Sequence, residues 1–253
     1  VSKVFRLTNY AMAIQFNRLS KLQGKQPCEP LKGDQEIIEL LKEGKMTKLE
    51  ANWRPFQLAF VLASIPEIVY PETYKDERKE VDLIWFPTGG GKTEAYLGLL
   101  AFTILYRRNL DPENAGVTSI MRYTLRLLTA DQFRRSAALI CALEYIRRDK
   151  TLSSDFGSEE ISLGLWIGGD ASPKTHKEAH SWMTKEIYFD KNKHYRFVLH
   201  ECPWCKSNLT KPENNGYVWR QKKVQIKCSD NNCTFSNSIP VVLWEEEVYE
   251  TKP

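Results

Sequence analysis

The sequence lacks the features of membrane-spanning, secreted and disordered proteins. Its uncharged stretch near Ala95–Tyr106 is well short of the roughly 20 apolar residues that cross a bilayer. The chain does not begin with a cationic segment followed by an apolar one, as a secretory signal would. Internal repeats are missing, and 13 Gly and 12 Pro in 253 residues exclude a collagen-like or linker-like composition. We therefore expect a cytoplasmic, globular protein with no membrane partner.

An excess of charge of one sign is also missing. With 36 Lys and Arg against 32 Asp and Glu, the net charge is a mild +4. Hydrophobic residues make up 42% of the chain, which is too much for a disordered protein. The length of 253 residues allows one large domain or two small ones, and a core of that size needs no disulfides. Because the chain starts at Val1 and ends at Pro253 soon after an acidic run, we expect an N-terminal fragment of a longer protein.

The order of apolar stretches predicts an α/β protein with a parallel sheet. Buried strands are expected at 81–86, 116–121 and 161–167, and helices at 92–108, 131–148 and 173–185. Strands that alternate with helices in this way are typical of a parallel sheet. Further helices are expected at 35–42 and 53–65, the second ended by Pro66. An apolar stretch at 239–244 predicts a strand that returns to the main sheet.

A glycine-rich loop between the first strand and its helix is the sharpest motif. Residues 87–93 read Pro-Thr-Gly-Gly-Gly-Lys-Thr. The glycines allow a tight turn whose backbone N–H groups point at phosphates, and the positive end of the following helix faces the same anion. Lys92 is expected to reach the β- and γ-phosphates of a nucleotide, and the Thr93 hydroxyl to bind Mg²⁺. The pattern departs from the common phosphate loop at Phe86, where a Gly usually stands.

This loop resembles that of superfamily 2 helicases and translocases, and other segments extend the resemblance. Residues 52–57 are similar to the element whose glutamine, here Gln57, reads the adenine edge through an amide that both donates and accepts. The segment 122–128 resembles a turn that grips single-strand phosphates, which implies Thr124 and Arg126 as contacts; Gly168 and Gly169 are similar to another such turn. The resemblance implies a RecA-like P-loop motor domain that binds ATP and Mg²⁺ through Gln57, Thr88, Gly89, Gly90, Gly91, Lys92, Thr93 and Glu94, with Lys92 and Thr93 taking part in catalysis.

The amino-acid sequence of these motifs is similar to that of the large helicase of DISARM phage-defence systems. That resemblance runs from about residue 53 to the end. It implies a bacterial ATPase that acts with other defence subunits on DNA, single-stranded or duplex with a single-stranded end. Hydrolysis would also need a carboxylate base and arginines from a second motor domain, so this chain alone should bind nucleotide and turn it over poorly. A non-catalytic nucleic-acid-binding adaptor with an ATP-sensing loop, and a P-loop small-molecule kinase, remain as alternatives.

Four cysteines in two close pairs predict a zinc ribbon. Cys202 and Cys205 form the first pair, and Cys228 and Cys233 the second. Two such knuckles offer four thiolates to one tetrahedral Zn²⁺, which is a structural arrangement because no coordination position stays open. His200 and Asp230 are reserve ligands. A cluster of four reduced thiols without metal is the alternative.

These motifs divide the chain into four expected parts. Residues 1–50 form a helical extension, and 51–199 an incomplete first RecA-like ATP-binding domain. The zinc ribbon is inserted at 200–236, and 237–253 return toward the motor domain.

Charge is distributed unevenly over these parts. The segments 121–150 and 202–233 each carry a net +4, so the rest of the chain is net acidic. In the ribbon the cations are interleaved with Tyr217, Trp219 and Phe235, which suits single-stranded nucleic acid. A solvated basic face with no ligand explains the ribbon's charge equally well. In the segment 121–150, a salt-bridged helix face is the alternative for its arginines.

Two further patterns resemble functional motifs, but we expect neither to bind a metal or to take part in catalysis. His176 and His180 lie one helical turn apart, and we expect them on a solvated helix face rather than on a metal. Glu245 and Glu246 follow an apolar stretch, as Mg²⁺-binding acids would. The helicases that this chain resembles, however, usually have Asp-Glu at that position, where this chain has Glu-Glu. We therefore do not expect these two glutamates to be catalytic.

Overall fold

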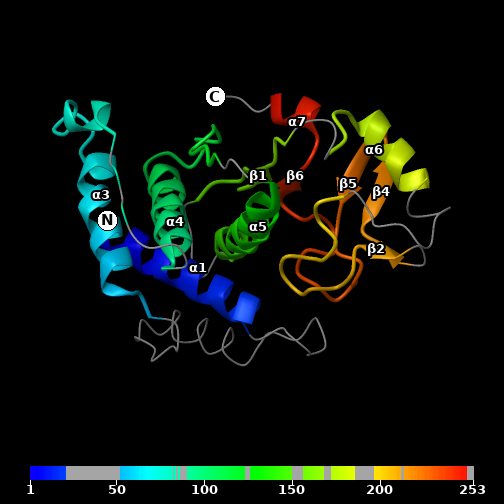
Figure 1. Ribbon diagram of the computed structural model, residues 1–253, viewed down its shortest axis with the longest axis horizontal. Coiled ribbons are helices and arrows are strands. Elements are labelled where there is room, and N and C mark those ends of the chain that lie inside the picture. Colours follow the sequence, from blue (N-terminus) through cyan, green and yellow to red (C-terminus); the bar gives the residue numbers. More distant parts are fainter. Residues whose placement is uncertain are drawn as a thin grey trace.

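The computed structural model combines long helices with short strands (Figure 1). It describes residues 1–20, 52–81, 83, 85, 90–122, 126–149, 156–167, 172–185, 197–211 and 214–249. The helices are α1 (Ser2–Ser20), α3 (Pro55–Val69), α4 (Lys92–Leu110), α5 (Arg126–Arg148), α6 (His176–Trp182) and α7 (Glu245–Tyr249), with a 3-10 turn at Glu77–Lys79. The strands are β1 (Leu163–Gly164), β2 (Thr210–Lys211), β3 (Asn214–Asn215), β4 (Tyr217–Arg220), β5 (Lys223–Ile226) and β6 (Val241–Val242). None of the helices in these ranges is long and apolar enough to cross a membrane.

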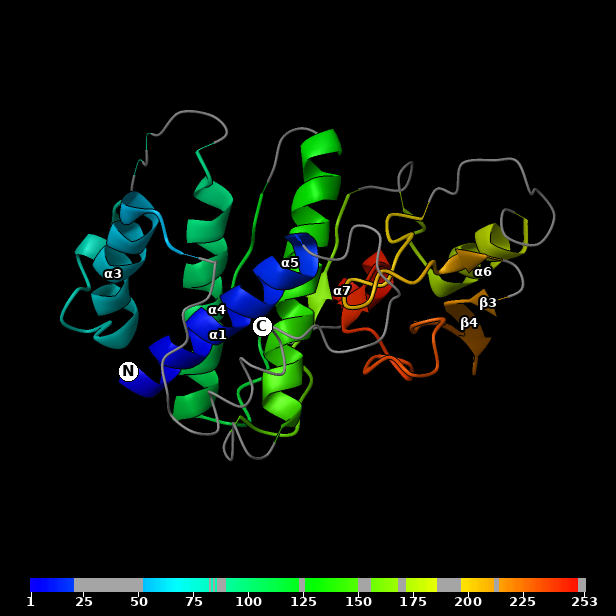
Figure 2. The same cartoon turned by 90° about the horizontal axis from the view of Figure 1, so that it is seen from below.

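Helix α1 crosses α4 and α5 and covers one side of both (Figure 2). Its buried residues Val4, Leu7, Ala11 and Ile14 recur three and four positions apart, so they share one face of the helix. This face packs into the same apolar core as the buried residues of α4 and α5. Only a general helical character was expected for this part of the chain, and the helix predicted at 35–42 lies outside the described residues.

Helix α3 runs past the residue that was expected to end it. Pro66 lies inside the helix, and the Tyr70 N–H still donates to the Pro66 carbonyl at 2.8 Å. The prediction of an end at Pro66 was therefore wrong. Because Ile68 and Val69 pack against the core, apolar burial outweighs the hydrogen bond that proline removes.

The two helices predicted at 92–108 and 131–148 are confirmed as α4 and α5, with slightly wider bounds. Helix α4 begins directly after Gly91, whose φ of 88° is in the left-handed region that glycine tolerates best. Gly98 in the same helix lets the Trp53 ring approach closely, since a Cβ there would lie 2.5 Å from the ring. Trp53 is held in place by a 2.7 Å hydrogen bond from its indole N–H to Asn9 of α1. The helix α6 is shorter than the predicted 173–185.

The strands are fewer than the sequence suggested. β1 and β6 pair in parallel, with Leu163 opposite Val241, so the predicted return strand does reach the strand expected at 161–167. At 81–86 the expectation of a buried strand was wrong for the described residues Val81, Leu83 and Trp85, which are 93%, 90% and 85% exposed. Residues 116–121 form no strand either. Among the described residues the only parallel pair is β1 with β6, so neither stretch has a neighbouring strand to pair with.

The cysteine-bearing region, residues 197–239, shares one apolar core with the helices. Trp204 is its main point of attachment: the ring stacks on Tyr145 of α5 at 5.3 Å and meets Phe235 edge-on at 5.4 Å. The Arg18 guanidinium of α1 lies 4.0 Å from the centre of the Trp204 ring and donates to its carbonyl oxygen. Such a cation over a tryptophan face is attractive because the ring carries negative charge density on its faces.

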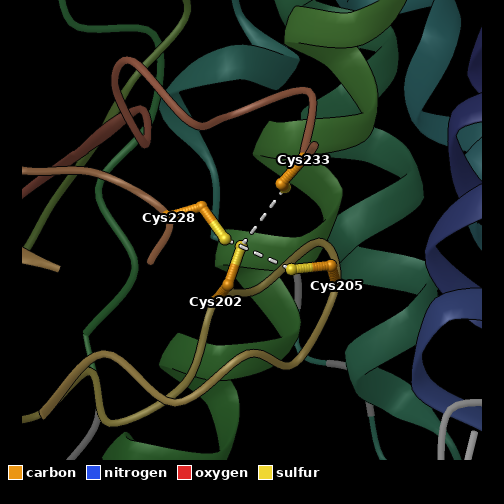
Figure 3. A group of neighbouring side chains, drawn as sticks. All are labelled: Cys202, Cys205, Cys228 and Cys233. Carbon is orange, nitrogen blue, oxygen red and sulfur yellow. Dashed lines mark hydrogen bonds between the residues drawn. The ribbon is translucent and has the colours of Figure 1, made fainter. Parts of the chain in front are cut away.

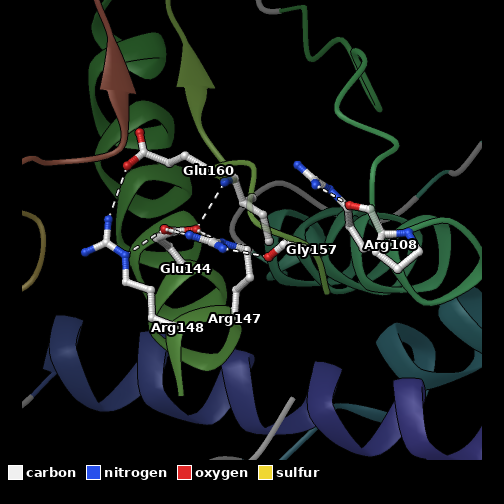
Figure 4. Close-up of polar contacts among 8 residues, drawn as sticks. Arg108, Glu144, Arg147, Arg148, Gly157 and Glu160 are labelled. Carbon is white, nitrogen blue, oxygen red and sulfur yellow. Dashed lines mark hydrogen bonds and ion pairs between the residues drawn. The ribbon is translucent and has the colours of Figure 1, made fainter. Parts of the chain in front are cut away.

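The end of α5 is joined to the start of β1 by a buried carboxylate (Figure 4). Glu144 has a fully buried side chain and accepts hydrogen bonds from Arg147 and Arg148 at 2.7 Å and from the Ile161 N–H at 3.1 Å. Burial by itself would raise the pKa of Glu144, but these hydrogen bonds outweigh it and hold the pKa below the ordinary 4.5. Arg148 also pairs with the half-exposed Glu160 at 3.2 Å.

The contact of Gly98 with Trp53 predicts an unusual outcome for a helix substitution. Gly98→Ala should destabilise the fold by about 1–3 kcal/mol because the new methyl group overlaps the indole ring. An unobstructed Gly→Ala change inside a helix would instead stabilise by about 1 kcal/mol. Trp53→Leu serves as the partner in a double-mutant cycle measured by urea unfolding. If Gly98→Ala is equally harmful with Leu at position 53, the contact does not explain the effect.

Removal of the Glu144 charge should be strongly destabilising. Glu144→Gln leaves Arg147 and Arg148 without their buried partner, and we expect a loss of about 3 kcal/mol in thermal or urea unfolding. Since the folded-state pKa is lowered, the stability that Glu144 contributes is present above pH ~4.5 and is lost as the pH falls through the folded value. The variant should therefore lose less stability on acidification than the parent protein does. Glu160→Gln, which alters a more exposed partner of Arg148, is the matched control and should cost under about 1 kcal/mol. Equal effects would contradict this assignment.

Candidate functional site

The four cysteines of the two predicted knuckles converge on one point (Figure 3). All four are buried, and their sulfur atoms lie within 4.8 Å of one another. The Cys202–Cys233 sulfur separation is 4.0 Å and the Cys205–Cys228 separation is 3.3 Å. Tetrahedral Zn²⁺ with bonds of about 2.3 Å places its sulfur ligands roughly 3.8 Å apart, so the cluster has the size of a tetrahedral metal site. Neither His200 nor Asp230 belongs to this group of ligands.

The four sulfur atoms interact with one another and with nearby backbone N–H groups. Backbone N–H groups of Asp230 and Phe235 donate to Cys228 and Cys233, at 3.3 and 3.5 Å. Hydrogen bonding to Cys202 lowers the pKa of Cys205, whereas the pKa of Cys202 is raised by the same network. Four thiols this close cannot all ionise without a cation, since like charges in contact disfavour each other. A divalent metal ion supplies the missing positive charge, and these residues fit such an ion.

The glycine-rich loop is described only where it enters α4. Thr88 and Gly89 lie outside the described residues, whereas Gly90 to Glu94 lie within them. Two side chains from the start of α3 hold this part of the loop: Arg54 donates to the Gly90 carbonyl at 2.6 Å, and Gln57 to the Gly91 carbonyl at 2.7 Å. The structure thus brings the segment 52–57 to the glycine loop, 34 residues further along the chain.

Gln57 is buried, and both ends of its amide are engaged. Its Nε2 donates to Gly91, and its Oε1 accepts from the Arg54 backbone N–H at 2.9 Å. Reading adenine would require the amide to leave these partners, so this role stays a prediction. Sequence reasoning missed Arg54 as a loop contact, although its position three residues before Gln57 places both at the first turn of α3.

Glu94, in the first turn of α4, forms a partly buried ion pair with Arg135 of α5. Lys92 and Thr93 directly precede it and are half-buried. The pair ties the helix that follows the loop to the neighbouring helix, which gives Glu94 a positioning role in addition to the nucleotide contact expected of it. Of the residues expected to hold DNA, Thr124, Gly168 and Gly169 lie outside the described residues, as does the side chain of Arg126, the first residue of α5.

Four of the seven cations in the basic segment 121–150 are paired with carboxylates. Arg147 and Arg148 bind Glu144, Arg135 binds Glu94, and Arg134 lies 3.9 Å from Asp131. These four arginines therefore follow the alternative of a salt-bridged helix face.

The aromatic residues of the cysteine-bearing region pack within the fold. Tyr217 and Phe235 are fully buried, and Trp219 stacks on His180 at 4.3 Å. All three therefore take part in packing within the fold.

The histidine pair of α6 is not solvated as expected. His176 is buried: its Nδ1 accepts from the Val224 N–H of β5 at 3.0 Å, and its Nε2 lies 3.6 Å from Glu247 of α7. Its backbone N–H donates to Glu246. The earlier expectation was wrong because β5 and α7, distant in sequence, cover this helix. Glu246 binds the start of α6.

One metal ion per chain should copurify with the protein. Elemental analysis is expected to give about one equivalent of a divalent metal, and Cys202→Ser should reduce it to near zero while lowering the melting temperature. Cys141→Ala is the matched control, because Cys141 is a buried free thiol outside the cluster. Full metal content in Cys202→Ser, or a metal-free protein with an unchanged melting temperature, would contradict this site.

Comparison with known proteins adds a relationship that geometry alone does not give. No family model matches the chain. DISARM protein DrmA from Bacillus paralicheniformis is 38% identical over 234 residues, an alignment that covers 83% of this chain. The chain spans 20% of the length of that relative. Over most of its length, therefore, this chain is a relative of the DISARM protein DrmA.

Proposed function

We propose that this chain is the ATP-binding part of the first motor domain of a DNA helicase or translocase in bacterial anti-phage defence. The observation that carries the proposal is the convergence of segment 52–57 on the glycine loop, joined to the relationship with DISARM protein DrmA. In this proposal the loop 88–93 binds the phosphates of ATP, Lys92 contacts the β- and γ-phosphates, and Thr93 binds Mg²⁺. A RecA-like fold, DNA as the partner, and work alongside other defence subunits belong to the same proposal.

The contacts around the loop support a nucleotide site whose backbone is already held in position, but in which Gln57 is bonded to the loop and not yet available to adenine. Arg54 and Gln57 hold the carbonyl groups of Gly90 and Gly91, which leaves the loop's N–H groups to point the other way, toward an anion. The N-terminus of the 19-residue helix α4 follows immediately and adds its partial positive charge. When ATP binds, Gln57 would exchange its Gly91 partner for the adenine edge.

Hydrolysis needs groups that the described residues do not supply. Glu246 is engaged by the His176 backbone, and the attack of water on the γ-phosphate requires a free carboxylate and positive charge from a second motor domain. We therefore propose that the chain binds MgATP and hydrolyses it poorly by itself. The four-cysteine cluster is proposed to hold Zn²⁺, which prefers four thiolates in a tetrahedron and then plays a structural part.

Lys92→Ala should weaken MgATP binding by about tenfold or more, equivalent to ~1.4 kcal/mol, because one charge-assisted phosphate contact is lost. Isothermal titration with a non-hydrolysable ATP analogue measures the effect. Lys75→Ala, in the exposed loop after α3, is the matched control and should bind as the parent does. Equal affinities for the two variants would refute a nucleotide site at this loop, and so would a parent protein that binds no nucleotide.

A further inference from the structure

The β4–β5 hairpin of the cysteine region has two faces of very different character. In its register Tyr217 pairs with Ile226 and Trp219 with Val224, and these four side chains form the inner face, which is packed against α6 and the core. The outer face carries the alternate positions. It includes Arg220 and Gln225 on their separate strands, both exposed. The hairpin lies at the end of the molecule opposite α3 in both views (Figure 1, Figure 2).

The outer face and tip of this hairpin carry cations and no acidic residue. We call Arg220, Lys222, Lys223 and Lys227 the hairpin cations. The segment 217–227 contains no acidic residue at all. Within the described part of the chain, no carboxylate forms an ion pair with any of the four, whereas Arg134, Arg135, Arg147 and Arg148 of α5 all have such partners. The hairpin cations are therefore available to a ligand, in contrast to these four arginines of α5.

The residues at the tip of the hairpin are ones that destabilise a β-turn. Arg220 and Lys223 are directly opposite each other, and like charges at a cross-strand pair are destabilising. The two residues between them, Gln221 and Lys222, both have positive φ, 49° and 63°, although such a two-residue turn prefers Asn and Gly. Three unfavourable choices at one exposed tip indicate that the side chains are there for a ligand.

We propose that the hairpin cations form a binding face for the phosphate backbone of DNA. Guanidinium and ammonium groups on one hairpin can contact successive phosphates, and this contact is independent of sequence. Lys223 and Lys227 are four residues apart, or roughly 13 Å along the strand, enough to reach more than one phosphate. Bases do not stack here, because the aromatic side chains of the hairpin lie on its inner face.

The four-cysteine cluster gives this face its rigidity. Cys228 follows the hairpin directly, and the Lys227 N–H donates to the Gly216 carbonyl at 2.9 Å, which closes the base of the ribbon. On the inner side, His176 accepts the Val224 N–H and anchors the middle of β5. The existence of an anion-binding face rests on the hairpin alone, whereas the choice of DNA as the anion rests on the proposed function.

Fluorescence anisotropy with a labelled DNA duplex carrying a single-stranded tail tests the proposal. The variant Arg220→Ser/Lys222→Ser/Lys223→Ser should bind about tenfold or more weakly than the parent chain. The slope of log affinity against log salt should fall by about 2–3 units, since each phosphate contact contributes about 0.9. The control is Lys75→Ser/Arg78→Ser/Lys79→Ser, which removes the same charges from the exposed loop after α3 and should change neither quantity. Metal content and MgATP affinity should be equal in all three proteins.

Two results would overturn the hairpin face. In one, both triple variants lose DNA affinity equally, which means that general charge and not this face attracts DNA. In the other, the parent chain fails to bind DNA even at low salt, or binds only vesicles of anionic lipid. Either result leaves the nucleotide site intact if MgATP binding still depends on Lys92, so the two proposals fail separately.

Discussion

The position of Trp204 is the constraint on which the arrangement of the whole molecule depends. This residue lies inside the first cysteine knuckle, yet its ring packs on Tyr145 of α5 and under the Arg18 guanidinium of α1. A metal ion that orders Cys202 and Cys205 therefore also orders the attachment of the cysteine region to the helices. Conversely, the packing of α1 on α4 and α5 provides the surface on which the knuckle rests. Through this one indole ring the fold joins the four-cysteine cluster, which has the size of a tetrahedral metal site, to helices α1 and α5.

The positively charged side chains differ between the helices and the β4–β5 hairpin. Several cations that lie among the helices are paired with carboxylates: Glu144 binds two arginines at the end of α5, and Glu94 binds Arg135 beside the glycine loop. Where cations lie on the hairpin, the described residues offer no such partner. Buried ion pairs satisfy a requirement of folding, because an unpaired buried charge is costly. Exposed unpaired cations are not required for folding, and we therefore assign the hairpin cations to ligand binding.

What the sequence could predict depended on how local each feature is. Helices α4 and α5 were found because their residues favour a helix along their whole length, and the four cysteines because each knuckle is short. Burial of Val81, Leu83 and Trp85 was predicted from apolar character alone and proved wrong, since burial depends on strands elsewhere in the chain. The burial of His176 was missed for the same reason, as β5 and α7 are the elements that cover it. Arg18 and Trp204 meet across 186 positions, and no local pattern announces such a contact.

The central claim is that the glycine loop serves a motor that acts on DNA. The most direct measurement is ATP hydrolysis by a longer protein containing this chain, with and without DNA. The account predicts that DNA stimulates hydrolysis severalfold and that Lys92→Ala abolishes the stimulated rate. A rate that is independent of DNA, or a stimulated rate that survives Lys92→Ala, would contradict it.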